Sequence, residues 1–132
     1  MRYIIGPLAI NPMKQNAISI RPFIGAKNFE RSRSFYKDLG FEEIVISPAL
    51  SLIRWGSLSF YLQNAYVQDW VDNTMIFFEV ESVQEVWDEL LALEPSKKYP
   101  DAKLSPIRVE SWGQECFLHD PSGILFHFGE FF

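Results

Sequence analysis

The sequence is poor in the residues that build disulfides, zinc sites and nucleic-acid surfaces. Its 132 residues include a single cysteine, Cys116, which excludes an internal disulfide and a cysteine-based zinc site. Lys and Arg number 12 against 17 Asp and Glu, and no basic run occurs, so nucleic acid is a poor candidate partner. A lone cysteine is typical of a reducing compartment, and we expect a cytoplasmic protein.

A long uninterrupted hydrophobic run is also missing. The apolar start of the chain is broken by Gly6, Pro7 and Pro12, and no small-residue cleavage pattern follows. We therefore expect neither a signal peptide nor a membrane span. A chain of this length forms one domain with its own core, and the aromatic content of 16% is typical of a packed β protein with an aromatic-lined cavity.

The clearest local pattern is a predicted hairpin near the C-terminus. The sequence Asp-Pro-Ser-Gly at 120–123 separates two short apolar runs, and its Pro and Gly are placed as in a type I or II turn. In strand geometry the residues after the turn divide between two faces: Ile124, Phe126 and Phe128 on one, Leu125 and His127 on the other. One face is therefore wholly apolar, and the other carries an imidazole.

The same order of elements occurs twice along the chain. The first module, 17–63, has predicted strands at 18–24, 41–46, 50–55 and 58–63, with a helix from 29 to 39 that Asn28 caps and Gly40 closes. After a linker at 64–73, the second module, 74–132, has strands at 74–80, 104–110, 115–118 and 124–128, with a helix at 83–93 that begins at the capping box Ser82–Glu85, and a loop at 95–103. The pattern predicts an α+β domain of two βαβββ modules, in which a mixed, cupped sheet carries its helices on the outer face. Residues 1–16 form an N-terminal extension with a short possible strand at 3–5.

Four of the predicted strands have an aliphatic face and an opposite face that carries both aromatic and polar residues, which we call the mixed face. The mixed face contains Ser19, Arg21 and Phe23; Ser59, Tyr61 and Gln63; Met75, Phe77 and Glu79; and Leu125 and His127. A face exposed to water would carry more Lys, Glu and Thr, whereas aromatic residues with a few converging polar groups are typical of a ligand pocket. The alternative is that both faces are core and that the polar residues satisfy one another, for example Arg21 with Glu79.

Four segments carry a family resemblance: NFERSRSFYKDLGF at 28–41, LSFYLQ at 58–63, DNTMIFFEVESVQEVWDEL at 72–90 and WGQECFLHDPSGILFHF at 112–128. Together they resemble the vicinal oxygen chelate superfamily, which includes glyoxalases, extradiol dioxygenases and bleomycin-resistance proteins. The last two segments are similar to the bleomycin-resistance branch. The resemblance implies the glyoxalase/bleomycin-resistance fold.

The enzymes of this superfamily hold a divalent metal at four inward positions, which correspond here to Arg21, Gln63, Met75 and His127. Arg cannot ligate a metal, and Met is too soft for oxygen-favouring ions, so two ligands remain. Glu79 lies one pleat from Met75 and would supply a third ligand only in a shifted register. We expect neither a metal nor another cofactor, with a displaced set of Gln63, Glu79 and His127 as the alternative.

The resemblance implies a metal-independent protein that sequesters an aromatic or amphipathic small molecule in a concave pocket, without catalytic residues. The predicted ligand-binding residues are Arg21, Phe23, Trp55, Tyr61, Gln63, Trp70, Met75, Phe77, Glu79, Trp112 and His127. Each of three of these residues also has a purely structural interpretation. Trp112 could pack in the core of the hairpin, Trp70 could anchor the linker, and His127 could be a partly buried imidazole whose hydrogen bonds are satisfied within the protein. The alternative functions are a metal-dependent glyoxalase- or dioxygenase-type enzyme and a stress or regulatory module without small-molecule chemistry.

We also expect a homodimer. In the bleomycin-resistance branch a dimer builds the ligand groove, and the resemblance implies the same here. The apolar N-terminal extension could add a strand to a neighbouring sheet edge, and the linker residues Tyr66, Val67 and Trp70 are of the kind that is enriched where subunits meet. The competing interpretation is that both segments fold back over their own chain.

Overall fold

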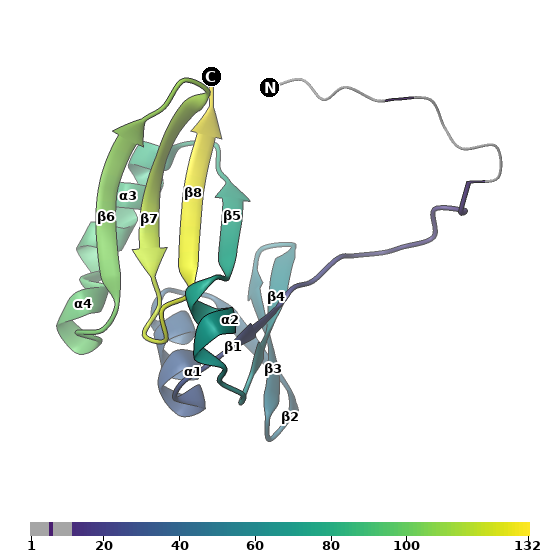
Figure 1. The fold of residues 1–132 in the computed structure, drawn as a ribbon. Helices are drawn as coiled ribbons and strands as arrows, with labels where there is room; N and C mark the ends of the chain where they lie inside the picture. Colours follow the sequence, from purple (N-terminus) through teal and green to yellow (C-terminus); the bar gives the residue numbers. More distant parts are fainter. Residues whose placement is uncertain (1–5, 7–11) are drawn as a thin grey trace.

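The computed structural model describes residue 6 and residues 12–132, and it contains two mixed four-stranded sheets (Figure 1). Sheet A has the order β1-β4-β3-β2 and contains β1 (Phe23–Gly25), β4 (Leu58–Gln63), β3 (Leu50–Trp55) and β2 (Glu42–Ser47). Sheet B has the order β5-β8-β7-β6 and contains β5 (Met75–Glu79), β8 (Leu125–Phe131), β7 (Gly113–His119) and β6 (Lys103–Val109). In each sheet the first strand of the module pairs in parallel with its last strand, and the other pairs are antiparallel. The two predicted βαβββ modules are confirmed.

Both predicted helices form, and each begins at the expected cap. In α1 (Phe29–Asp38) the side chain of Asn28 accepts a hydrogen bond from the backbone N–H of Arg31, and in α3 (Val83–Leu93) Ser82 accepts one from Glu85. Helix α1 packs on β2 and β4, and α3 packs on β6, β7 and β8, so that helices cover one face of each sheet. Within the described residues no helix is long and apolar enough to cross a membrane.

Two short helices replace segments that were predicted to be irregular. Helix α2 (Gln68–Asp72) lies in the predicted linker, and α4 (Pro95–Lys98) lies in the predicted loop at 95–103. Pro95 occupies the first turn of α4, where its missing N–H leaves no helical hydrogen bond unmade. A helix of four or five residues is too short to show a periodic apolar pattern, so neither helix could be predicted from periodicity.

The predicted strand at 18–24 is wrong over most of its length, because regular structure begins only at Phe23. Ile18 and Ile20 are 99% and 96% exposed. Alternating apolar residues form a strand only where a neighbouring backbone supplies hydrogen-bond partners. Before Phe23, the carbonyl of Pro22 accepts a backbone hydrogen bond from the N–H of Tyr61 on β4, and no such bond to β4 involves residues 18–21. The possible strand at 3–5 lies outside the described residues.

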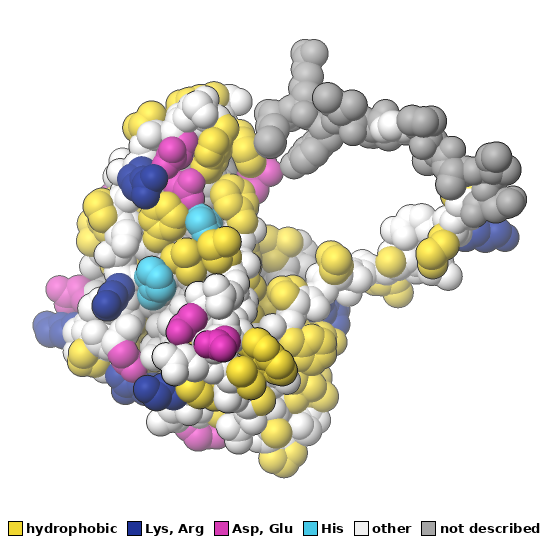
Figure 2. Space-filling view, in the orientation of Figure 1, with side chains coloured by type: hydrophobic (Ala, Val, Ile, Leu, Met, Phe, Trp, Pro, Cys, Tyr) yellow, Lys and Arg dark blue, Asp and Glu magenta, His cyan; other side chains and the backbone are white. Residues whose placement is uncertain are grey.

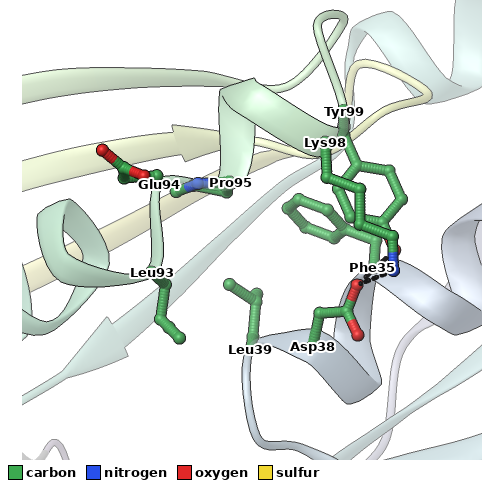
Figure 3. Close-up of a pocket in the computed structure, with 8 residues that line it drawn as sticks. All are labelled: Phe35, Asp38, Leu39, Leu93, Glu94, Pro95, Lys98 and Tyr99. Carbon is green, nitrogen blue, oxygen red and sulfur yellow. Dashed lines mark hydrogen bonds and ion pairs between the residues drawn. The ribbon is translucent and has the colours of Figure 1, made fainter.

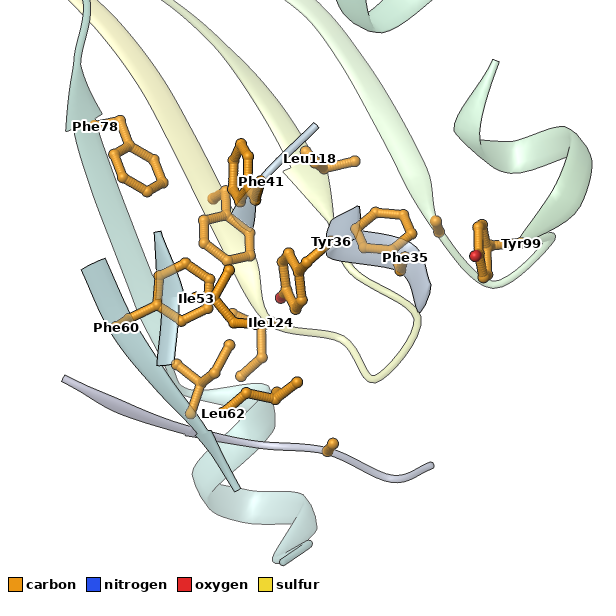
Figure 4. Close-up of a cluster of buried hydrophobic side chains, with 14 of the residues drawn as sticks. Phe35, Tyr36, Phe41, Ile53, Phe60, Leu62, Phe78, Tyr99, Leu118 and Ile124 are labelled. Atoms are coloured by element: carbon orange, nitrogen blue, oxygen red, sulfur yellow. The ribbon is translucent and has the colours of Figure 1, made fainter. Parts of the chain in front are cut away.

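One hydrophobic core joins the two modules (Figure 4). Its centre is Tyr36 of α1, which is fully buried. The Tyr36 ring contacts Phe41 and Phe60 of the first module and Phe126 of the second, with ring centroids 5.3 to 6.1 Å apart. The helix-covered faces of the two sheets therefore share one core, and the modules cannot separate without exposing it.

A buried carboxylate fixes the Asp-Pro-Ser-Gly turn to this core. The hydroxyl of Tyr36 donates to Oδ2 of Asp120 at 2.5 Å, and Oδ1 accepts from the backbone N–H groups of Ser122, Gly123 and Ile124 at 2.9 Å each. Burial raises the pKa of Asp120 to about 6, although these hydrogen bonds oppose the rise. The turn is thus held to α1 of the other module by a group that no solvent reaches.

The raised pKa of Asp120 predicts how stability depends on pH. The folded protein binds the proton more tightly than the unfolded chain, so the contribution of Asp120 is fully present below about pH 4 and is lost as the pH rises through about 6. We expect the free energy of unfolding of the wild type, measured relative to Asp120→Asn by urea denaturation, to fall by up to about 3 kcal/mol between pH 4 and pH 7. A difference that grows with pH over this range would contradict the assignment.

Candidate functional site

Each sheet has a face that is not covered by helices, which we call its open face. On β8 the predicted alternation is confirmed: Phe126 and Phe128 are buried, and His127 is partly exposed. On β5, Phe78 is buried, whereas Phe77 is 45% exposed. The residues of the predicted mixed faces on β4, β5 and β8 thus lie on the open faces, and the apolar residues between them pack in or against the core.

The open face of sheet A collects five of the predicted site residues. Nη1 of Arg21 donates to the hydroxyl of Tyr61 at 3.1 Å, and the ring of Phe23 stacks on Tyr61 with centroids 4.7 Å apart. Trp70 of α2 lies beside this group, where it lines a cavity of about 110 Å³ together with Phe23 and Gln63. The face offers a stacked aromatic pair, a guanidinium and an amide.

The expected alternative pairing of Arg21 with Glu79 does not occur. Both residues are described, and no ion pair joins them; Arg21 bonds to Tyr61 instead. Glu79 is exposed on β5 in sheet B, where it is the register partner of Gly129 on β8. The polar groups of the two open faces are therefore left to interact with something other than each other.

The open face of sheet B is built around an imidazole–carboxylate pair. Nδ1 of His127 lies 2.7 Å from Oε1 of Glu115 on β7, and Glu115 is only 8% exposed. A carboxylate accepts hydrogen bonds, so the imidazole donates from Nδ1, and Nε2 has no partner among the described residues. The rings of Phe117 and Phe77 flank the imidazole, with centroids 5.0 and 6.1 Å away. His127 is thus held in one orientation by a neighbour on each side, and Nε2 is the atom left for a ligand.

A second histidine lies on the same face (Figure 2). His119 of β7 is the register partner of Leu125 on β8, and its Nδ1 is buried without a hydrogen-bond partner. Burial, with smaller contributions from Lys103 and His127, lowers the pKa of His119, so the imidazole is neutral at pH 7. It adds one polar ring nitrogen, Nε2, to the open face without adding charge.

An aromatic cluster closes the end of the face. The rings of Phe77, Trp112 and Phe131 lie 5.0 to 5.9 Å apart. They meet over Gly129, where a Cβ would come within 2.3 Å of Cζ of Phe77 and 3.2 Å of Cη2 of Trp112. The absence of a side chain at Gly129 therefore allows the Phe77 ring to lie against the backbone of β8.

Sequence reasoning missed Glu115, Phe117, His119 and Phe131. The first three alternate along β7, and their parity matches that of His127, but the match becomes visible only once β7 is known to pair with β8. Phe131 was missed because the predicted strand stops at Phe128, whereas β8 continues through Gly129 to Phe131.

Trp55 was predicted to bind ligand, and the structure places it, partly buried, against the core on the helix-covered side. Its ring stacks on Phe41 at 5.3 Å and meets Phe78 and Phe128 edge-on at 5.2 and 5.8 Å. On β3 it shares the parity of Ile53, which is fully buried, and so points to the helix-covered side. Trp55 joins the two modules rather than lining an open face.

The polar and aromatic groups of the two open faces do not contact one another within the described chain, although Ser59 of sheet A and Phe77 and Glu79 of sheet B border the same cavity of about 500 Å³. No hydrogen bond, ion pair or aromatic contact between described residues joins the group around Tyr61 in sheet A to the group around His127 in sheet B. The common concavity expected from strand parity is therefore divided between two sheets, because the shared core turns their helix-covered faces toward each other. One chain carries two half-sites.

The displaced metal set does not come together within one chain either. Gln63 ends β4 in sheet A, whereas Glu79 and His127 belong to sheet B, and Nδ1 of His127 is already bonded to Glu115. In the described part of the chain, no group of three or more His, Cys, Asp or Glu side chains is placed to hold a metal ion. The donors of a single chain do not fit a catalytic ion, which needs three protein ligands.

The packing at Gly129 predicts a variant that alters the site without unfolding the protein. In Gly129→Ala the new methyl group must displace the flexible Phe77 ring, so we expect a changed near-ultraviolet circular dichroism signal from Trp112 and a stability loss of about 1 kcal/mol. In Gly113→Ala the new Cβ would lie 2.0 Å from the backbone oxygen of Glu130, and the β-ladder itself must shift.

Urea denaturation of both variants checks this difference. We expect Gly113→Ala to lose more free energy of unfolding than Gly129→Ala. The backbone oxygen of Glu130 is held in the β-ladder and can move less than the side chain of Phe77. Equal losses, or an unchanged Trp112 signal in Gly129→Ala, would contradict the assigned packing of Phe77.

The chain matches no family model and no curated protein in sequence. In structure it is similar to the bleomycin-binding protein of bleomycin-producing Streptomyces verticillus in complex with copper(II)-bleomycin, with a TM-score of 0.74, 21% identity, and coverage of 87% of this chain and 97% of the other. A bleomycin resistance determinant encoded on the transposon Tn5 has a TM-score of 0.72 at 18% identity, covering 86% and 98%. A lactoylglutathione lyase from Agrobacterium tumefaciens has a TM-score of 0.66 at 18% identity, covering 88% and 96%. The chain therefore has the fold that bleomycin-resistance proteins share with glyoxalase-related enzymes.

Proposed function

We propose that the protein binds an aromatic or amphipathic small molecule, without a metal, in a groove between two copies of the chain. The open face of sheet A from one copy would close over the open face of sheet B from the other. The observation that carries this proposal is the exposure of the aromatic side chains on both faces. Phe23 is 55% exposed and Phe77 is 45% exposed, and no described part of the same chain covers them.

The chemistry of the two half-sites suits binding by stacking with a few polar anchors. Sheet A offers the stacked rings of Phe23 and Tyr61 beside the Arg21 guanidinium. Sheet B offers the Phe77 and Trp112 rings beside the oriented imidazole of His127. Aromatic faces stack on planar ligands, and the polar groups fix orientation. No activated nucleophile lies among the described residues of either face, which supports sequestration over bond-making.

Two further observations support this ligand class. Proteins of the same fold are described as binding bleomycin or an antibiotic. The chain also has a net charge of −5, which mildly favours a cationic ligand. A bleomycin-type glycopeptide, with planar aromatic parts and a cationic tail, is accordingly the first compound to test.

Exposed apolar side chains on and beside the two faces support a second copy of the chain. Ile18 and Ile20 are almost fully exposed, and Trp70 is 72% exposed. Ile18 and Ile20 also border a cavity of about 500 Å³ beside Phe77. A stable soluble monomer rarely leaves such a series uncovered, whereas a homodimer would bury it.

The alternative function is a metal-dependent enzyme of the glyoxalase type. The Agrobacterium lyase has the same fold, and the unpartnered Nε2 of His127 is a suitable metal ligand. Such a site would need Gln63 from one copy and Glu79 with His127 from the other. Elemental analysis of the purified protein separates the two proposals: about one tightly held ion per chain, lost in His127→Ala, favours the enzyme.

The binding proposal predicts saturable quenching of tryptophan fluorescence by bleomycin. We expect Phe77→Ala to weaken the affinity about tenfold, because the ligand loses a stacking surface. The matched variant Phe132→Ala removes a ring that is 78% exposed and should change nothing. Trp112→Phe should remove most of the quenching signal.

The result that would contradict the proposal is the absence of saturable quenching by bleomycin and by a set of other planar aromatic antibiotics. Equal weakening in Phe77→Ala and Phe132→Ala would also contradict the placement of the ligand on the open face of sheet B.

Light scattering tests the assembly. At micromolar concentration we expect twice the chain mass of 15.4 kDa. Phe23→Asp should shift the protein toward the monomer, since it places a charge in the proposed interface. A monomer mass for the wild type would contradict the dimer, and an unchanged dimer after deletion of residues 1–12 would show that the N-terminal extension is not required.

A further inference from the structure

A separate cavity lies on the helix-covered side of the protein, away from both open faces (Figure 3). It has a volume of about 330 Å³ and lies between the C-terminal end of α1 and the junction of α3 with α4. This volume is at the small end of the range that is typical of ligand pockets. The cavity is formed by one chain and does not depend on a dimer.

The floor and walls of the cavity are apolar. Leu39 and Leu93 extend into the gap from the ends of α1 and α3 (Figure 3). The rings of Phe35 and Tyr99 meet edge-on, with centroids 5.2 Å apart, and Pro95 lines the α4 side. A small hydrophobic body can therefore be accommodated.

The rim of the cavity contains two helix C-termini and two carboxylates. Helices α1 and α3 both end here, at Asp38 and Leu93, and the carboxyl end of a helix carries a partial negative charge. Helix α3 has no basic residue in its last turn, and the basic residue of α1, Lys37, lies against Glu43. The carboxylates of Asp38 and Glu94 line the cavity as well, and each is paired with a lysine of α4: Asp38 with Lys98 at 2.8 Å and Glu94 with Lys97 at 3.6 Å. A cation therefore binds at Asp38 in exchange for Lys98 rather than in addition to it.

The protein already places one primary ammonium group at this rim. Nζ of Lys98 lies 2.8 Å from Oδ2 of Asp38 and 5.5 Å from the centre of the Tyr99 ring. The Tyr99 hydroxyl donates to the same carboxylate oxygen at 2.6 Å, whereas Oδ1 of Asp38 has no hydrogen-bond partner in the part of the chain that the structure describes. The hydrogen bonds from Lys98 and Tyr99 lower the pKa of Asp38, so the carboxylate stays charged. The Lys98 side chain is 68% exposed, and it is therefore a weakly held occupant that an external ammonium can replace.

We propose that this cavity is a second ligand site, which binds a small hydrophobic primary ammonium compound. The ammonium takes the place of Lys98 on Asp38 and over the Tyr99 ring, where hydrogen bonding and cation–π attraction both favour it. The hydrocarbon part packs against Leu39 and Leu93. The site is independent of the groove proposed above, and either can exist without the other.

Benzylammonium is a suitable probe, followed by NMR of the Leu39 and Leu93 methyl groups in the full-length protein. We expect saturable shifts of both methyl resonances, and affinity about tenfold weaker for benzyl alcohol, which has the same size but no charge. Asp38→Asn should weaken benzylammonium binding about tenfold. The matched variant Asp88→Asn, on the exposed face of α3, should leave the affinity unchanged.

Lys98→Ala gives the sharpest test, because removal of the internal competitor should strengthen benzylammonium binding several-fold. A purely structural Asp38–Lys98 pair predicts no change in affinity. Equal affinities for benzylammonium and benzyl alcohol, weaker binding in Lys98→Ala, or no methyl shifts would each overturn the proposal. Shifts confined to Phe77 and His127 would also overturn it, since they would place the probe in the groove.

Discussion

The arrangement of the whole molecule depends on the hydrogen bond between Tyr36 and Asp120. It joins the first module to the second at a point that water does not reach, since both side chains are fully buried. The same carboxylate closes the turn between β7 and β8, and so fixes the strands that carry Glu115 and His127. A buried carboxylate without these partners would be strongly destabilising, and the turn, α1 and the core are therefore held in one arrangement.

This arrangement also determines where a ligand can bind. Because the core lies between the helix-covered faces, the two open faces belong to different sheets, and the group around Tyr61 makes no direct contact with the group around His127 among the described residues. Each carries exposed aromatic rings and an oriented polar group: Arg21 on Tyr61 in sheet A, and His127 on Glu115 in sheet B. The proposed groove follows from this division, since a second copy is the simplest surface able to present the missing half.

Local patterns predicted much of the fold, and long-range pairing accounts for what they missed. The strands β3 and β4 have the bounds expected from their alternation, and the caps at Asn28 and Ser82 depend only on neighbours in sequence. The face on which His127 lies also follows from the alternation of its own strand alone. Its bond to Glu115 does not, because it depends on the pairing of β7 with β8. Ile18 illustrates the opposite error. The residues around it alternate as in a strand, but no strand forms there because no neighbouring strand in the described chain pairs with them.

Complementation between two variants tests most directly whether the site is shared between two copies. Phe23→Ala damages the half-site on sheet A, and Phe77→Ala damages the half-site on sheet B. If bleomycin binds in a groove made from both, each pure variant binds weakly, and an equal mixture that exchanges subunits regains about a quarter of the wild-type binding capacity, because each mixed dimer contains one undamaged groove. No recovery after demonstrated subunit exchange would contradict the shared groove.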